Sequence, residues 1–282
     1  MTLHERLADA RARLVAAGIR PDDAAIDVGL YACAILGWDR ARLLAEQHQP
    51  APPQLEPRLS EWVGRRARRE PSAYITGVRE FWGLEFAVTP AVLIPRPETE
   101  FIVEEALAIV GPSTDARVAD IGTGSGCVAV AIAHDRPACR VVATDISRDA
   151  LEVARRNAAR HDVAARIAFV ETAYLDGVAA PFDLIAANPP YVKDGDKPIL
   201  GASVRYEPDV ALFGGAEGLR DIAGVLDAAI EKLDRGGWLV MEFGYGQEEH
   251  VEALIAARAA LELVRVRADL QGIPRTAIIQ RA

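Results

Sequence analysis

Along residues 115 to 282, short apolar runs alternate with longer stretches in which apolar side chains recur at helical spacing. The runs contain many β-branched residues, which favour strands, and the stretches between them are long enough for crossover helices. This alternation is typical of a mostly parallel sheet with helices on both faces. The predicted strands are Arg117 to Ile121, Val141 to Thr144, Ile167 to Val170, Phe182 to Ala187, Trp238 to Phe243, Val264 to Ala268 and Thr276 to Gln280. The predicted helices of this part are Gly126 to Ala133, Arg148 to His161, Leu219 to Leu233 and Glu248 to Ala259.

The first 70 residues have a helical pattern instead. Leu55, Leu59 and Val63, for example, recur at the spacing of one buried helix face. Between residues 75 and 94, β-branched and aromatic residues punctuated by glycine and proline predict a short hairpin. Helical periodicity resumes over Glu98 to Val110, with acidic residues in the first turn, where the helix dipole favours them. We therefore predict a helical domain at residues 1–73, a hairpin linker at 74–95 and an α/β domain at 96–282.

The composition indicates a soluble protein with a large core. Half of the 282 residues are apolar, and no apolar run reaches the roughly 18 residues that a membrane-spanning helix needs. His4, Glu5 and Arg6 lie where a signal peptide would need an apolar stretch, so we expect a cytoplasmic protein with no membrane attachment. The three cysteines lack CxxC spacing, which favours reduced core thiols, and we expect no metal site and no disulfide.

The net charge of −9 argues against bulk binding of nucleic acid. Residues 1–95 hold 12 basic and 12 acidic side chains, so the whole acidic excess lies in the remaining residues. A protein that binds phosphates through its net charge usually has the opposite sign. One basic cluster, Arg65, Arg66, Arg68 and Arg69, ends a predicted helix, where it either complements the helix dipole or forms a docking patch for an acidic macromolecule.

A glycine-rich loop follows the first predicted strand of the α/β domain. In the segment Asp120-Ile121-Gly122-Thr123-Gly124-Ser125-Gly126, glycines occupy alternate positions between strand and helix. Without Cβ atoms, these residues let the backbone turn tightly and approach a ligand, and the next helix offers free N–H groups. A dinucleotide-binding loop would need its third glycine at position 127, which is Cys127, so it fits poorly. A phosphate-binding P-loop is excluded because no Gly-Lys-Ser or Gly-Lys-Thr follows.

Asp145 ends the second predicted strand, about 20 residues after the glycine loop, at the distance from which a carboxylate can accept both hydroxyls of a ribose. Ser147 and Asp149 nearby make a helix cap the alternative role, although the glycine loop favours ribose. S-adenosylmethionine is a nucleoside that carries a sulfonium and a carboxylate tail instead of a pyrophosphate. We therefore predict it as the cofactor, with its amino acid end against the glycine loop on the Asp120 side.

The segment Asn188-Pro189-Pro190-Tyr191 stands where the apolar run Phe182 to Ala187 stops. Two prolines fix the backbone and cannot donate hydrogen bonds, so the Asn188 amide and the neighbouring carbonyls are available as acceptors. An NH2 group offers two protons to such acceptors, which indicates a site that methylates a planar, weakly nucleophilic nitrogen. By itself the tetrapeptide is equally compatible with an ordinary loop after a strand, because Asn-Pro often begins turns.

These motifs together resemble class I methyltransferases, and in particular the peptide chain release factor N5-glutamine methyltransferases (the PrmC family, formerly HemK). The resemblance covers nearly the whole chain. It rests also on Glu70-Pro71-Ser72-Ala73-Tyr74-Ile75-Thr76-Gly77, on Glu80-Phe81-Trp82-Gly83, on Leu93-Ile94-Pro95-Arg96-Pro97-Glu98-Thr99-Glu100, and on Glu207-Pro208-Asp209-Val210-Ala211-Leu212 with Gly214, Gly215, Gly218 and Leu219.

The resemblance implies an α/β class I methyltransferase domain with a doubly wound, mostly parallel sheet, preceded by a small helical domain and a linking β-hairpin. It assigns S-adenosylmethionine to Gly122, Thr123, Gly124, Ser125, Gly126 and Asp145, with Asn188 also near the cofactor. The family's adenine contact falls on Ala173 by spacing, with Thr172 or Tyr174 as alternatives. Glu98, Thr99 and Glu100 either line the sulfonium pocket or simply begin a helix.

The resemblance also implies the reaction, which is methyl transfer to the side-chain amide nitrogen of the glutamine in the Gly-Gly-Gln motif of release factors. Asn188, Pro189, Pro190 and Tyr191 would bind that glutamine, with Asn188, Pro189 and Tyr191 catalytic. The expected partners are release factors, held by the N-terminal helices. We expect a monomer that binds no nucleic acid stably.

Three alternatives stay open at this point. The first is an N6-adenine methyltransferase, since an exocyclic adenine amine is also a planar NH2 group, although the net acidity disfavours it. The second is methylation of a glutamine in a ribosomal protein, which the Pro-Arg-Pro-Glu-Thr-Glu segment disfavours. The third is a non-catalytic binding module that retains a nucleoside pocket only for stability, against which the intact Asn188 argues.

Overall fold

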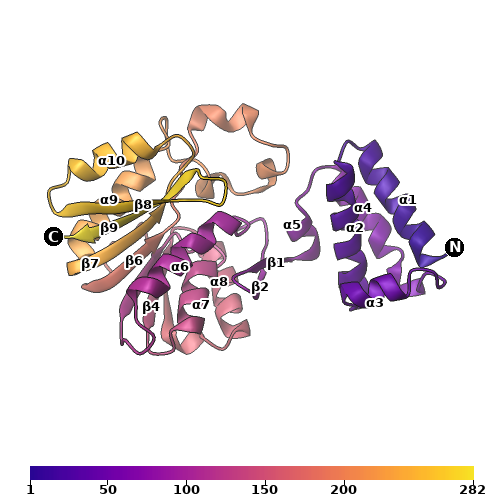
Figure 1. Cartoon of the computed structure of the whole chain (residues 1–282), viewed down its shortest axis with the longest axis horizontal. Coiled ribbons are helices and arrows are strands. Elements are labelled where there is room, and N and C mark those ends of the chain that lie inside the picture. The colour runs from indigo at the N-terminus through magenta and orange to yellow at the C-terminus, as the bar shows by residue number, and fades with distance from the viewer. The chain divides into compact units, whose positions relative to one another are not determined.

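The computed structural model describes all residues from Met1 to Ala282. The chain forms two compact units, shown in Figure 1. One unit, here the helical unit, comprises Met1–Gly77 with Gly201–Tyr206, and the other, the α/β unit, comprises Val78–Leu200 with Glu207–Ala282. The domain limits expected at residues 73 and 95 stay predictions.

The helical unit is built from amphipathic helices around one core, as the sequence pattern predicts. Its first helix begins with a capping box, in which Thr2 Oγ1 accepts from the Glu5 backbone and Glu5 accepts from the Thr2 backbone. Leu14, Tyr31 and Leu59 are fully buried in the shared core. The elements are α1 (Leu3–Ala16), α2 (Pro21–Leu36), α3 (Arg40–Ala45), η1 (Pro53–Leu55), α4 (Arg58–Ala67) and α5 (Ser72–Thr76).

Three of the four arginines in the basic cluster at the end of α4 are tied into the helical unit by their side chains. Arg65 Nε donates to Glu70 at 2.9 Å, and Arg66 Nε donates to Asp27 at 2.7 Å. Arg69 donates to the backbone carbonyl that follows α1, at 3.1 Å. Because these guanidinium groups have internal acceptors, their positions are explained without an external partner.

The α/β unit begins with an antiparallel hairpin, β1 (Val78–Phe81) and β2 (Leu84–Ala87), as predicted. The main sheet has seven strands in the order β5-β4-β3-β6-β7-β9-β8. All neighbouring pairs are parallel except those of β9, which runs antiparallel to both β7 and β8. The strands are β3 (Arg117–Ile121), β4 (Arg140–Asp145), β5 (Ile167–Glu171), β6 (Phe182–Ala187), β7 (Leu233–Glu242), β8 (Leu261–Ala268) and β9 (Pro274–Arg281).

Helices cover both faces of this sheet, which confirms the predicted α/β fold (Figure 1). The faces follow from the alternation of side chains along each strand. Val118 and Leu184 belong to the core under α6 and α7, whereas Ala119 and Ile185 belong to the core under α9 and α10. The helices are η2 (Pro97–Thr99), α6 (Glu100–Ile109), α7 (Cys127–Asp135), α8 (Arg148–Arg160), η3 (Ala164–Arg166), α9 (Arg220–Lys232) and α10 (Glu248–Ala256).

The order of the strands determines where a ligand can bind. The chain moves outward from β3 through β4 to β5 on one side, and through β6 and β7 on the other. In open α/β sheets, the crevice for a ligand lies at this reversal, outside the carboxyl ends of the strands. The glycine loop after β3, Asp145 at the end of β4 and Asn188 after β6 all lie at that edge.

Some details differ from the sequence-based prediction. The helix expected from Glu98 begins at Glu100, because Pro97–Thr99 forms a 3-10 turn first. Strand β7 starts at Leu233 rather than Trp238, since its pairing with β6 extends back through a register shift. The segment after Tyr191 contains three short 3-10 turns that no periodic pattern announces: η4 (Asp194–Ile199), η5 (Val204–Tyr206) and η6 (Asp209–Ala211). None of the helices combines the length and the apolar composition that a membrane-spanning segment needs.

Candidate active site

The glycine loop forms an open cradle between β3 and α7. Gly122, Gly124 and Gly126 have φ of +69°, +54° and +82°, a region that favours glycine. A Cβ on Gly126 would lie 3.0 Å from the Cβ of Ala154 in α8, so the absence of a side chain lets α7 and α8 pack closely. A Cβ on Gly122 would meet no atom within 4 Å, and one on Gly124 would meet only a backbone oxygen at 4.0 Å. The first two glycines therefore face open space.

A buried carboxylate holds this loop in shape. Asp120 is 2% exposed, and its Oδ2 accepts hydrogen bonds from Thr123 Oγ1 at 2.6 Å and from the Ala129 backbone nitrogen at 3.1 Å. Burial raises the pKa of Asp120 to about 6, against the lowering effect of these two bonds. Asp120 thus links both ends of the loop to the end of β3.

Asp145 occupies the end of β4 beside the loop. Its Oδ2 accepts from the Gly124 backbone nitrogen at 2.9 Å, and its Oδ1 accepts from the Ser147 backbone nitrogen at 2.8 Å. Burial raises the pKa of this carboxyl, opposed by its backbone hydrogen bonds. The side chain that caps α8 is Ser147, which accepts from the Ala150 nitrogen. Asp145 is therefore not the cap of that helix, and it remains available at the pocket wall.

The Asn188 to Tyr191 segment is held by a chain of hydrogen bonds between side chains. Asn188 Nδ2 donates to Thr99 Oγ1 at 3.0 Å, and Thr99 Oγ1 donates to Glu242 Oε2 at 2.7 Å. Tyr191 Oη donates to the other oxygen of Glu242 at 3.1 Å. Two side chains of the segment are therefore connected to one carboxylate at the end of β7.

Glu242 is 1% exposed. Burial raises its pKa to about 7, although the hydrogen bonds from Thr99 and Tyr191 act in the opposite direction. The pKa of the Tyr191 phenol is also raised, first by burial and then by the nearby Glu242 charge. The sequence did not identify Glu242, because it ends an apolar run and Thr99 is 143 residues away.

The backbone of the same segment is packed against a glycine-rich stretch further along the chain. A Cβ on Gly214 would lie 2.3 Å from the Pro190 carbonyl oxygen, and one on Gly218 would lie 2.2 Å from the Tyr191 carbonyl oxygen. Gln247 Nε2 donates to that Tyr191 oxygen at 3.0 Å. These contacts explain why the resemblance includes glycines at 214 and 218.

Two of the other segments that carried the resemblance are joined by an ion pair. Arg96 donates to both carboxylate oxygens of Glu207 at 2.7 Å. Glu207 is 5% exposed, and burial raises its pKa while the charge of Arg96 lowers it. The pair connects the chain just before η2 to the segment that follows the Asn188 motif.

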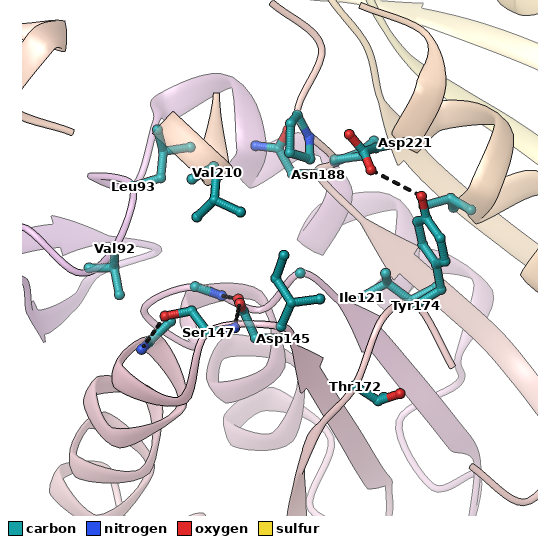
Figure 2. A pocket seen from close by; sticks show the side chains of 18 of the residues that line it. Val92, Leu93, Ile121, Asp145, Ser147, Thr172, Tyr174, Asn188, Val210 and Asp221 are labelled. Atoms are coloured by element: carbon teal, nitrogen blue, oxygen red, sulfur yellow. Dashed lines mark hydrogen bonds between the residues drawn. The ribbon is translucent and has the colours of Figure 1, made fainter. Parts of the chain in front are cut away.

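One cavity joins the two parts of the site. It has a volume of about 140 Å³. In Figure 2, Asn188 and Asp145 lie on opposite sides of this pocket, and the Tyr174 to Asp221 hydrogen bond of 3.0 Å lies at one end. Of the predicted residues, those that line the cavity are Gly122, Gly124, Asp145, Asn188, Pro189 and Pro190. Those that do not are Thr123, Ser125, Gly126, Ala173 and Tyr191.

Ala173, the predicted adenine contact, does not line the cavity, but its two neighbours in the chain do. Thr172 and Tyr174 line the cavity, on either side of Ala173 in the chain. The Tyr174 ring packs on α9, where a Cβ on Gly224 would come within 2.1 Å of a ring atom. Tyr174 is thus a fixed aromatic wall of the pocket, and its adenine role stays a prediction, as do the roles assigned to the other site residues.

The chain matches known proteins over both units. A model described as PrmC N-terminal domain matches residues 5–77, and one described as methyltransferase small domain matches residues 99–203. The release factor glutamine methyltransferase of Bradyrhizobium diazoefficiens is 40% identical over 93% of this chain and 91% of that protein. The one of Moorella thermoacetica is 40% identical over 100% of this chain and 99% of that protein. The chain belongs to the release factor glutamine methyltransferase family.

Solved structures share the fold of this family member at low sequence identity. The catalytic domain of hMettl16, solved in complex with MAT2A 3′UTR hairpin 6, aligns with a TM-score of 0.58 and 16% identity over 76% of this chain and 81% of that one. A methyltransferase from Pyrococcus furiosus aligns with a TM-score of 0.55 and 20% identity over 77% of this chain and 98% of that one. These likenesses confirm the class I methyltransferase fold.

The cofactor of this methyltransferase is S-adenosylmethionine, as predicted. The residues present fit it, because side chains on Gly122 and Gly124 would project into the space that the cradle leaves open. Asp145 at the pocket wall would offer its carboxylate to the ribose hydroxyls, and the apolar side chains of Ile121 and Ile146, which line the same cavity, would contact a flat base.

Proposed function

We propose that this protein methylates the side-chain amide nitrogen of the glutamine in the Gly-Gly-Gln motif of release factors. The observation that carries the proposal is the orientation of the Asn188 amide. Its Nδ2 donates to Thr99, so its Oδ1 is left as an acceptor beside the cavity that the glycine loop and Asp145 also line.

The chemical difficulty of the reaction is the substrate nitrogen. Amide resonance withdraws its lone pair, so a ground-state carboxamide is a poor nucleophile. Asn188 Oδ1 and the Pro189 carbonyl would accept its two N–H protons, which orients the nitrogen and favours the positive charge that develops on it. Because that charge is absent in the ground state, such acceptors stabilise the transition state preferentially. When bound, S-adenosylmethionine supplies an electrophilic methyl group on a sulfonium.

In this proposal, Tyr191 helps to position the substrate carboxamide. Its hydroxyl donates a hydrogen bond to Glu242, which fixes the orientation of the ring. A fixed aromatic ring suits the flat face of a carboxamide and attracts partial positive charge. No strong general base is required, since the methylated nitrogen becomes acidic enough to lose its proton to solvent.

A direct experiment tests this function. The protein is incubated with S-adenosylmethionine labelled in its methyl group and with a purified release factor, in parallel with a factor whose Gly-Gly-Gln glutamine is replaced by alanine. We expect label in the intact factor and none in the variant. Label that persists in the variant would assign another acceptor, and label transferred to added DNA or RNA instead would favour adenine methylation.

We further propose that the helical unit holds the release factor, because one glutamine must be selected among many. Ile26 and Leu30 of α2 and Leu44 of α3 are 64%, 43% and 58% exposed. They line a hollow of about 580 Å³ within this unit. Exposed apolar side chains around a hollow favour a protein partner. The match of residues 5–77 in the helical unit to the PrmC N-terminal domain supports the same role.

Substitution of these three residues by serine tests that role. We expect the KM for an intact release factor to rise about 10-fold, as for loss of an interface hot spot. The dissociation constant for S-adenosylmethionine should not change, because the hollow lies in the helical unit and the cofactor cavity lies in the α/β unit. Leu270→Ser is the matched control, since Leu270 is 96% exposed in the α/β unit. A KM within twofold of the wild-type value in the triple variant would contradict the proposal.

A further inference from the structure

Glu242 and Thr99 are buried polar residues whose presence the reaction does not by itself require. Glu242 ends β7 and is 1% exposed, and Thr99 ends η2 and is 3% exposed. Burial of a carboxyl group is unfavourable unless its oxygens are hydrogen-bonded. Here the only side chains that donate to it are Thr99 and Tyr191, one to each oxygen. The Glu242 carboxylate therefore interacts with the Asn188 to Tyr191 segment through both of its oxygens, directly with Tyr191 and through Thr99 with Asn188.

The direction of each hydrogen bond follows from the number of protons available. A threonine hydroxyl has one proton, and Thr99 gives it to Glu242 Oε2. Toward Asn188, Thr99 Oγ1 can then only accept. Asn188 must present its Nδ2 to Thr99, at 3.0 Å, because the rotated amide would place Oδ1 against lone pairs with no proton between them. The carboxylate thus selects one of the two amide orientations.

We propose that Glu242 and Thr99 are positioning residues for methyl transfer, and that the ionised Glu242 carboxylate, acting through the Thr99 hydroxyl, fixes the Asn188 amide with Oδ1 toward the substrate nitrogen. The proposal rests on the function proposed above. Glu242 acts on the substrate only through Asn188 and Tyr191, and neither it nor Thr99 touches the reacting atoms.

The charge on Glu242 is sensitive to pH. The pKa of Glu242 is raised to about 7, chiefly by burial, with Glu98 raising it further and Arg275 lowering it. Arg275 lies on β9 and also pairs with Asp269 at 3.3 Å. A proton on Oε2 would be donated to Thr99, whose own proton could then turn toward Asn188 and allow the rotated amide. Turnover should therefore rise with pH as Glu242 ionises.

Three isosteric or near-isosteric variants test the relay. Thr99→Val removes the hydroxyl, whereas Thr99→Ser keeps it. Thr276→Val is the matched control, because Thr276 is opposite Glu242 in the sheet and its buried hydroxyl has no hydrogen-bond partner. We expect kcat to fall about 30-fold in Thr99→Val, between the loss of one ordinary hydrogen bond and that of a transition-state acceptor. Thr99→Ser and Thr276→Val should stay within about threefold of the wild type.

Three further measurements separate positioning from a merely structural role. The dissociation constant for S-adenosylmethionine and the thermal unfolding midpoint should remain close to wild type in Thr99→Val. In the cofactor-free protein, the side-chain NH2 resonances of Asn188, assigned by their loss in Asn188→Ala, should shift in Thr99→Val and return in Thr99→Ser. If Thr99→Val does not fold, the same comparison is made between wild type and Glu242→Gln over a pH series.

The pH series gives the decisive outcomes. In the wild type we expect kcat to increase through an apparent pKa of about 7, and in Glu242→Gln we expect that limb to disappear. The inference is overturned if Glu242→Gln keeps the limb, if Thr99→Val retains kcat within twofold, or if Thr276→Val loses as much as Thr99→Val. A wild-type protein that does not label a release factor would instead contradict the proposed function.

Discussion

Two buried carboxylates, Asp120 and Glu242, lie at the ends of β3 and β7, the two strands that flank β6 in the sheet. Asp120 receives a threonine hydroxyl and a backbone N–H on a single oxygen, whereas Glu242 receives two side-chain hydroxyls, one on each oxygen. Asp120 holds the backbone of the glycine loop in shape, whereas Glu242 orients the side chains of Thr99 and Tyr191. Under the proposed function, we infer from this difference that cofactor binding depends on a backbone cradle and that substrate alignment depends on a network of rotatable side chains.

The comparison has an energetic side. Burial raises the pKa of both carboxyl groups, to about 6 for Asp120 and about 7 for Glu242. Each therefore retains a charge near neutral pH at the expense of some folding free energy. Such groups are common at functional sites, where alignment outweighs stability.

The largest effect is expected at the atom that meets the substrate. Asn188→Ala should lower kcat by about 10²-fold, as for loss of one transition-state partner, and change the dissociation constant of S-adenosylmethionine much less. Steady-state kinetics and calorimetric titration of the cofactor measure the two quantities. Near-normal turnover would remove the acceptor role of Asn188.

On the cofactor side, Asp120→Ala should weaken S-adenosylmethionine binding by about 30-fold, because Thr123 and the Ala129 nitrogen lose their buried acceptor. Asp120→Asn is the matched control, since both hydrogen bonds end on Oδ2 and an amide oxygen can accept both. Binding titrations of the two variants provide the measurement. If Asp120→Ala lowered kcat at saturating cofactor while affinity was retained, the contrast between the two carboxylates would fail.

Stability as a function of pH sharpens the same contrast. A carboxyl group with a raised pKa in the folded state binds more protons there than in the unfolded chain, so the free energy of unfolding falls as pH rises between the two values. The window runs from 3.8 to about 6 for Asp120 and from 4.5 to about 7 for Glu242. Between pH 6 and 7, Glu242→Gln should therefore flatten the decline, by about 1 kcal/mol, and Asp120→Asn should not.

Urea unfolding at pH 5, 6, 7 and 8 measures this free energy in the wild type and both variants. Equal slopes for wild type and Glu242→Gln would show that the folded-state pKa of Glu242 is not raised.

The smallest effect is expected for the second donor to Glu242. Tyr191→Phe removes one hydroxyl and keeps the ring, so kcat should fall only about threefold, the size of one ordinary hydrogen bond. Single-turnover methyl transfer measures the step directly. A loss as large as that of Asn188→Ala would mean that the phenol itself takes part in the chemistry.

The sequence predicted the parts of this architecture that depend on local pattern. Strands β3 and β6 were predicted at their observed bounds, because buried parallel strands are continuous apolar runs between turn signals. The glycine loop, Asp145 and Asn188 were placed at strand ends for the same reason. The helical character of residues 1 to 70 followed from amphipathic spacing.

The rest depends on contacts between distant residues. Glu242 appeared as the polar end of an apolar run, and only the fold brings it to Thr99 and Tyr191. The Tyr174 wall likewise depends on α9, where Gly224 leaves space for its ring. Neither arrangement has a periodic signal, so neither could be predicted from spacing alone.

The glycines at 214 and 218 have a consequence for engineering. Any larger residue at either position would push on a carbonyl oxygen of the Asn188 to Tyr191 segment, since its Cβ would lie 2.2 to 2.3 Å from that oxygen. The tetrapeptide is therefore shaped by a stretch of chain that begins more than twenty residues downstream. If those four residues were grafted onto another scaffold, the sequence would be transferred but not its backbone conformation, unless the downstream glycines were grafted with it.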